Sequence, residues 1–256
     1  MELQLEAFDS LSLAQMEDIK LMERVDKKFA IPLDILPLIL GQLEPVYYIQ
    51  EIEGRRSFDY VTLYYDTSNY EMYKQHQNGK LNRLKIRTRE YVNSNLCFLE
   101  IKRRSNKGVT KKIRIINSYP NSIATPDCSS FITSNTPYCP AFLEAKIWCI
   151  YKRITLIDKE KTERLTIDYD LSFKNIHTGK NITLPEMVII ELKKGQMTYS
   201  PVLSYLNQQR IKPMNISKYC IGVALTECCD AVKTNAIKNK ILNLKKITTF
   251  EYGEHS

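Results

Sequence analysis

The sequence predicts a mainly β (α+β) fold, an antiparallel barrel or a sandwich with flanking helices. Three observations support it: a two-residue hydrophobic period over most of the chain, turn signals between the periodic runs, and few helical stretches. The strand-like runs are 25–31, 58–66, 83–91, 96–104, 111–116, 147–157, 164–171 and 187–193. The helical stretches are 11–21, 33–43, 68–77, 201–209 and 217–229. We expect one domain over residues 1–230 and a basic C-terminal tail or helix over 231–256.

Composition favours a globular protein with an anionic partner. Of the 256 residues 43% are hydrophobic, which suffices for a sizeable core, and the net charge is +8. Such a charge suits a nucleic acid, a phosphate compound or an acidic membrane, and by itself does not choose among them. The seven cysteines are scattered without a C-x-x-C pair, which suggests reduced thiols and a cytoplasmic location. The longest apolar stretch, 35–43, is too short to cross a bilayer, while attachment through a membrane-protein partner stays open.

Charged residues gather on one face of six predicted strands. Side chains two apart on a strand share a face, so Arg83, Lys85, Arg87 and Arg89 lie together and Ile86 faces the other way. The charged positions on the other five strands are Asp26 and Lys28; Glu100, Lys102 and Arg104; Lys112 and Arg114; Arg164, Asp168 and Asp170; Glu191 and Lys193. For any single strand, the simplest interpretation is a half-exposed sheet with its charges in water.

Across six strands that interpretation weakens. Four cations in a row repel one another unless an anion lies between them. Exposed ion pairs contribute only ~0–1 kcal/mol each, so stability gives little reason for so many. Closing the sheet into a barrel turns the charged face into a bore that concentrates anions. The pattern therefore favours a closed barrel that binds a polyanion.

The residue types in this bore suit phosphate and a divalent metal. Arginine and lysine bind phosphate oxygens, and carboxylates bind Mg²⁺ or Mn²⁺. The candidate carboxylates are Asp26, Glu100, Asp168, Asp170 and Glu191. The sequence has no G-x-x-x-x-G-K-[ST] loop, G-x-G-x-x-G turn or H-E-x-x-H motif, so side-chain cations must hold the phosphates. For His76 a structural role is favoured, and Trp148 and the tyrosines are expected in the core or on the barrel exterior.

Nine short segments in order resemble the VTC-type polyphosphate polymerase domain, a branch of the triphosphate tunnel metalloenzymes. They are ERVDKKF (23–29), LYYDT (63–67), RLKIRTREY (83–91), FLEIK (98–102), KKIR (111–114), YKR (151–153), ERLTIDYDL (163–171), IIELK (189–193) and SKYCIG (217–222). The resemblance implies a closed eight-stranded tunnel that binds a nucleoside triphosphate with Mn²⁺ or Mg²⁺. It also implies transfer of the terminal phosphoryl group of the nucleotide, such as ATP, onto a growing inorganic polyphosphate chain.

Site residues follow from the same resemblance. The implied phosphate and nucleotide ligands are Lys28, Arg87, Arg89, Lys102, Lys112, Arg114 and Arg153. Glu191 is the implied metal ligand and Lys218 the implied catalytic lysine. Hydrolase relatives begin with an E-x-E-x-K strand, and here Arg24 stands where another acid would be. Fewer acidic ligands favour one metal and transfer to phosphate rather than to water, although Asp168, Asp170 or Glu100 could supply the missing oxygen.

Two other functions remain open at this stage. One is a metal-dependent triphosphatase or polyphosphatase, and the other is a non-catalytic module that binds polyphosphate or inositol phosphates. Nucleic acid is not an expected partner, because the cationic strands hold only Tyr91 and Phe98 for base stacking. The preferred nucleotide, the priming acceptor and the oligomeric state are not evident from the sequence.

Overall fold

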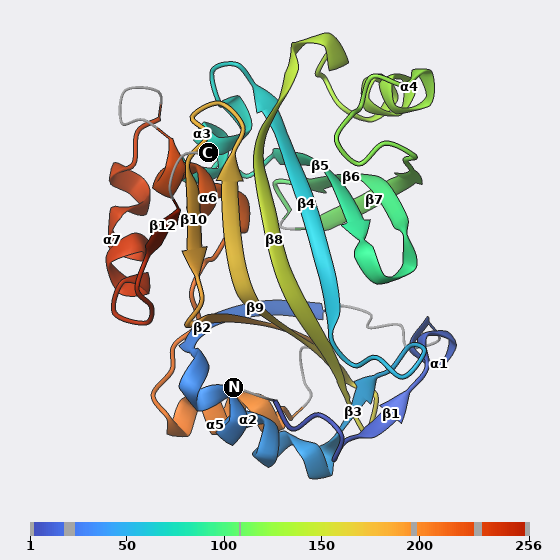
Figure 1. Ribbon diagram of the computed structural model, residues 1–256, viewed down its shortest axis with the longest axis vertical. Coiled ribbons are helices and arrows are strands. Elements are labelled where there is room, and N and C mark those ends of the chain that lie inside the picture. The colour runs from blue at the N-terminus through green and yellow to red at the C-terminus, as the bar shows by residue number, and fades with distance from the viewer. Residues whose placement is uncertain (1–2, 18–23, 108, 196–198, 228–231, 254–256) are drawn as a thin grey trace.

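A strongly curved antiparallel sheet forms the centre of the protein (Figure 1). The computed structural model describes residues 3–17, 24–107, 109–195, 199–227 and 232–253. Along the curve the strands follow the order β2 (Arg24–Pro32), β11 (Met187–Gly195), β9 (Glu163–Asn175), β8 (Leu143–Asp158), β4 (Phe58–Thr67), β5 (Arg83–Tyr91), β6 (Leu96–Arg104) and β7 (Thr110–Ile116). All eight predicted strand runs are confirmed, and each neighbouring pair is antiparallel.

The sheet is tunnel-like but does not close, so the prediction of a closed eight-stranded barrel is wrong. Strands β2 and β7 are the two ends of the curve, and no pairing joins them within the described residues. The free edge of β2 is used differently: the Met214 amide donates to the Lys28 carbonyl at 2.7 Å. The segment before helix α6 (Lys218–Thr226) thus occupies the edge that a closing strand would need.

Helices cover the convex face of the sheet. Helices α2 (Leu36–Leu43) and α5 (Pro201–Gln208) pack side by side against β2, β11 and β9, around the buried Ile31 and Ile190 (Figure 1). Helix α4 (Pro126–Asn135), which the sequence does not predict, packs Ile132 against the outer face of β4 to β6. The outward residues Leu63, Ile86 and Leu99 are completely buried there.

Helix α6 packs against the concave face instead. Its apolar residues join a core cluster with Tyr64 of β4, Ile147 of β8 and Phe173 of β9. Helices α3 (Glu71–Gln77) and α7 (Asn235–Leu244) hold it from behind, with Tyr73 and Ile237 in the same cluster. One part of the concave face is therefore apolar and filled by a helix, and the other part is charged.

A β-bulge in β9 separates the two parts. The pairing of β8 with β9 shifts register between Ile150 and Lys152, and Asp170 has a φ of 54°. Because the extra residue inverts the alternation, Asp168 faces the lumen before the bulge, and Leu171 and Phe173 face it afterwards. Asp170 is exposed, so its predicted place in the bore is wrong.

The remaining elements extend the sheet and cap its ends. They are β1 (Asp9–Leu11), α1 (Leu13–Glu17), β3 (Tyr47–Gln50), β10 (Asn181–Leu184), β12 (Glu251–Gly253) and the 3-10 turns Leu33–Ile35, Glu44–Val46, Val92–Ser94 and Pro140–Phe142. Of the predicted helix 11–21 the structure describes α1 over Leu13–Glu17, and residues 18–23 lie outside the described part. After residue 231, Ile237 and Leu244 of α7 are buried, and β12 pairs with β10. No helix of the described residues is long and apolar enough to cross a membrane.

Candidate functional site: a cationic lumen

The charged side chains of the strands face one another across the concave side of the sheet, which we call the lumen. Lys102 lies on β6, and four strands separate β6 from β11 along the sheet. Burial lowers the pKa of Lys102 to about 8, and the charges of Glu191 on β11 and Lys28 on β2 act on it as well. Since these groups are distant along the sheet, their influence must cross the concave side. The predicted inward orientation of the cationic rows is confirmed, although the wall around them is open.

Glu100 on β6 holds two of the predicted phosphate ligands. Its side chain is 1% exposed, and Arg87 of β5 contacts it through Nε at 2.8 Å and Nη2 at 2.7 Å. Lys112 of β7 forms an ion pair with the other carboxylate oxygen. Burial alone would disfavour the anion, but Arg87, Arg89 and Lys112 keep the pKa of Glu100 below its usual range. Glu100 therefore acts as an anchor that positions cations.

Asp168 on β9 plays the same part on the other side of the lumen. Arg153 of β8 donates to it through Nε at 2.5 Å and Nη2 at 2.8 Å. Lys218, the first residue of α6, donates to the same carboxylate. Despite complete burial, Arg153 and Lys218 hold the pKa of Asp168 below its usual range. The catalytic lysine implied by the family resemblance thus shares one carboxylate with Arg153, which the resemblance implies to bind phosphate.

Glu191 is held less tightly. Its carboxylate lies 3.7 Å from the Lys28 amine and 3.8 Å from the Lys193 amine, and its side chain is 15% exposed. Burial opposes its ionisation, yet the surrounding cations Lys28, Lys193, Arg153 and Lys102 keep the pKa of Glu191 well below its usual range. It is an anion at neutral pH, with longer ion-pair distances than those of Glu100 and Asp168. An added divalent cation could compete for this carboxylate.

Buried tyrosine rings contact the arginines of the lumen. The sequence does not predict these contacts. The rings of Tyr60 and Tyr151 are stacked, with centroids 5.3 Å apart, on the concave face. Arg153 lies 5.1 Å from the Tyr60 centroid, and Arg89 lies 5.4 Å from it. Lys218 lies 4.5 Å from the Tyr151 centroid. These rings belong to the core, as expected, but they also orient three site cations through cation–π contacts.

Most of the predicted site residues come together, and Arg114 lies at the margin. Lys28, Arg87, Arg89, Lys102, Lys112, Arg153, Glu191 and Lys218 are linked by the contacts and electrostatic influences above. Arg114 on β7 is exposed and stacks on Phe98, 4.3 Å from the ring centroid. His76 on α3 lines a small cavity together with Ser217, and burial and the nearby cations Lys85 and Arg83 lower its pKa to about 2. At neutral pH it is therefore uncharged.

The carboxylates do not form a protein-only metal cage. Within the described residues no group of three or more His, Cys, Asp or Glu side chains could hold a metal ion. A magnesium-type ion commonly uses one or two carboxylates and completes its shell with water and substrate phosphates. Glu191 among phosphate-binding cations fits that second arrangement, so the residues present are compatible with a metal that arrives together with a triphosphate.

A curved antiparallel sheet with these cations and carboxylates on its concave face defines a triphosphate tunnel protein. The family model described as the VTC domain matches residues 23–227, and the chain therefore belongs to the VTC domain family. No curated protein matches the chain.

Solved structures show distant similarity. A Hippeastrum protein described as a candidate adenylyl cyclase with a dominant triphosphatase activity has a TM-score of 0.49 and 14% identity, covering 81% of this chain and 98% of that one. A candidate adenylate cyclase from Vibrio parahaemolyticus has a TM-score of 0.46 and 11% identity, covering 79% and 99%. A conserved hypothetical protein from Pyrococcus furiosus has a TM-score of 0.41 and 12% identity, covering 77% and 99%. With all three scores below 0.5, these similarities carry no argument about activity.

Proposed function

We propose that the protein is a polyphosphate polymerase. It transfers the terminal phosphoryl group of a nucleoside triphosphate, ATP in the first instance, onto a growing inorganic polyphosphate chain. The observation that carries the proposal is the convergence of cations from β2, β6, β8 and β11 around Glu191. Side chains rather than a backbone loop must bind the phosphates, and arginine forks with lysine amines suit that task.

The arrangement assigns a role to each group. Arg87, Arg89 and Arg153 bind and orient the triphosphate, because carboxylates and tyrosine rings already fix their guanidinium groups. Lys218 lies at the wall where α6 begins and neutralises charge that develops on the transferred group. Lys28 and Lys102 bind the chain of phosphates across the lumen from one another.

The proposed transfer forms one phosphorus–oxygen bond and breaks another. A terminal oxygen of the polyphosphate chain forms a bond to the terminal phosphorus of the nucleotide, and the bond from that phosphorus to its bridging oxygen breaks. The nucleoside diphosphate leaves with the bonding electrons. Mn²⁺ or Mg²⁺, held by Glu191 and phosphate oxygens, would neutralise charge on the reacting phosphates.

The carboxylate contacts favour transfer to phosphate over hydrolysis. Water activation with a second metal needs additional acidic ligands, and Glu100 and Asp168 are already engaged by two cations each. Asp170 points away from the lumen. The side chain of Arg24, where the hydrolases carry another acid, lies outside the described residues. The ion-pair distances of Glu191, 3.7 and 3.8 Å, are longer than those of Glu100 and Asp168, which supports a single metal at Glu191.

Incubation of the full chain with ATP and Mn²⁺ tests the proposal. Polymer longer than a triphosphate, resolved on a polyacrylamide gel, is the expected product, together with a nucleoside diphosphate. Orthophosphate as the sole phosphate product would replace the polymerase with a triphosphatase. Tight polyphosphate binding without turnover would replace it with a binding module. The Glu191→Gln variant serves as the metal-site control, and its polymer synthesis should be about 100-fold slower or more.

A further inference from the structure

The start of α6 is held from two sides of the lumen. The Lys28 amine of β2 donates to the Ile216 carbonyl at 3.5 Å, and the Lys85 amine of β5 hydrogen-bonds the Ser217 hydroxyl oxygen at 2.9 Å. Ser217 is the residue before α6, and Lys218 follows it directly. The position of the Lys218 amine therefore depends on contacts made by its neighbours in sequence.

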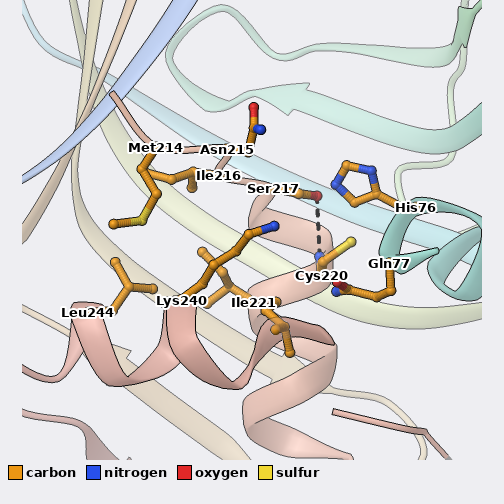
Figure 2. A pocket seen from close by; sticks show the side chains of 11 residues that line it. His76, Gln77, Met214, Asn215, Ile216, Ser217, Cys220, Ile221, Lys240 and Leu244 are labelled. Atoms are coloured by element: carbon orange, nitrogen blue, oxygen red, sulfur yellow. Dashed lines mark hydrogen bonds between the residues drawn. The ribbon is translucent and has the colours of Figure 1, made fainter. Parts of the chain in front are cut away.

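Ser217 is also the N-cap of the helix. Its hydroxyl oxygen accepts a hydrogen bond from the Cys220 amide at 3.3 Å, shown as the dashed line in Figure 2. His76 of α3 and Lys240 of α7 line the same small cavity of about 10 Å³, which has room for a single water molecule. Lys85 thus contacts the side chain that caps the start of α6, and that side chain lines a cavity with little free space.

The surroundings of Lys85 disfavour a positive charge. Lys102 lies directly opposite it in the pairing of β5 with β6, and Arg87 shares its face on β5. The positive end of the α6 dipole points toward the same region. Burial, together with Lys28, Lys102 and Arg87, lowers the pKa of Lys85 to about 7.

The other groups that face this region leave it cationic. His76 on α3 is close enough for Lys85 and Lys240 to act on its pKa, which burial lowers to about 2. The Cys220 thiol of α6, whose pKa is raised chiefly by burial, stays neutral near pH 7. A neutral Lys85 amine can keep its hydrogen bond by accepting the Ser217 proton, and a charged one keeps it by donating.

We propose that Lys85 is a positioning residue that fixes the start of α6, and with it Lys218, and that it takes up a proton when a polyanion fills the lumen. A nearby negative charge favours the ammonium form over the amine. The proton comes from the buffer, and no covalent bond changes. The inference rests on the proposed function insofar as both require a polyphosphate in the lumen.

Isothermal titration calorimetry with tripolyphosphate tests the proton uptake. The full chain is titrated at pH 7, without divalent metal, in several buffers that differ in ionisation enthalpy. The slope of observed enthalpy against ionisation enthalpy gives the protons exchanged per ligand bound. Lys85→Arg keeps the charge but cannot lose its proton at this pH, so it should take up about half a proton fewer than the unchanged protein.

Two further variants complete the test. Lys111→Arg, on the outer face of β7, should leave the proton count unchanged. Lys85→Met should show the same loss of uptake as Lys85→Arg and should also lower kcat for synthesis about tenfold, as expected for one lost positioning hydrogen bond.

The outcomes separate the inference from the function. Tripolyphosphate binding with equal proton counts in the unchanged protein and both Lys85 variants overturns the proton uptake. An unaltered kcat in Lys85→Met overturns the positioning role. Failure of the unchanged protein to bind tripolyphosphate at all removes the proposed function itself.

Discussion

The two parts of the concave face affect stability in opposite ways. Beyond the β9 bulge, Leu171 and Phe173 pack against α6 in an apolar core. Before it, the same face carries Asp168, Arg153 and the rest of the cationic lumen. Burying apolar surface stabilises the fold, while gathering like charges opposes it.

Carboxylates hold the cations of the lumen in place. Glu100 and Asp168 each bind two cations tightly, whereas Glu191 lies 3.7 Å from its nearest amine. The three carboxylates on the concave face thus have two different roles. Glu100 and Asp168 hold cations in place, and Glu191 is the best candidate for a metal ligand.

The largest effect is expected at Asp168, where the two parts meet. Asp168→Asn removes the charge that compensates Arg153 and Lys218, and breaking a buried pair of this kind costs about 3–5 kcal/mol. Urea denaturation measures the change in the free energy of unfolding. Asp170→Asn, two residues along and exposed, is the matched control and should remain within about 0.5 kcal/mol. Equal losses in both variants would mean that Asp168 is not an anchor.

Glu191→Gln should separate activity from stability. Because its ion pairs are longer, we expect a loss of about 1 kcal/mol in the free energy of unfolding. Polymer synthesis with Mn²⁺ should fall about 100-fold or more, since a bound metal contributes several kcal/mol to charge stabilisation. The measurements are denaturation and the initial rate of polymer formation. A variant with near-normal synthesis would show that Glu191 is not the metal ligand.

In the apolar part, Gly222→Ala tests the close approach of α6 to the sheet. A Cβ at Gly222 would lie 2.5 Å from Ile147 Cδ1 and 2.7 Å from Phe173 Cδ1. Overpacking typically costs about 1–3 kcal/mol, partly offset by about 1 kcal/mol of helix propensity. Gly41→Ala in α2, with nothing within 4 Å of the added atom, should instead stabilise slightly. Stabilisation by both substitutions in thermal denaturation would indicate that α6 packs loosely.

Much of this division was visible in the sequence. A period of two puts Arg87 and Ile86 on opposite faces whatever the tertiary structure, so the strands and their charged faces are predictable. The family resemblance points to Lys218, which the local sequence alone does not distinguish from an ordinary surface lysine. The pairing of Lys218 with Asp168 is a tertiary contact between residues 50 apart, which no local pattern encodes.

The errors also have physical causes. Strict alternation placed Asp170 in the lumen, but one residue in the left-handed region inverts the pattern. Barrel closure depends on whether two edge strands meet, and the residues before α6 take the edge of β2 instead. From sequence, Arg87→Ala, Arg89→Ala and Lys218→Ala should each relieve repulsion and, if anything, raise the melting temperature in phosphate-free buffer. The contacts reverse that expectation for Arg87 and Lys218, because each compensates a buried carboxylate.

The smallest expected effect is the change of the free energy of unfolding with pH. The direction of this change distinguishes the charged part of the concave face from an ordinary protein surface. The folded-state pKa is lowered to about 7 for Lys85 and about 8 for Lys102, below the unfolded value near 10.4. Between these values the unfolded chain binds more protons at these lysines, so the free energy of unfolding should rise from pH 7 toward pH 9. Above that range the trend should weaken and then reverse, because burial raises the pKa of Cys97 to about 11 and the pKa values of Cys149, Tyr60 and Tyr151 to about 12, and the unfolded chain loses those protons first.

Thermal denaturation in phosphate-free buffer at several pH values measures this trend. With saturating tripolyphosphate the rise should flatten or reverse, because the ligand favours the charged amines. Lys85→Arg should show a smaller rise without ligand, whereas Lys111→Arg on the outer face should match the unchanged protein. Stability that stays level from pH 7 to pH 9.5 in all three proteins would mean that the lumen amines are as well solvated as surface lysines. Such a result would contradict the view that the lumen concentrates anions.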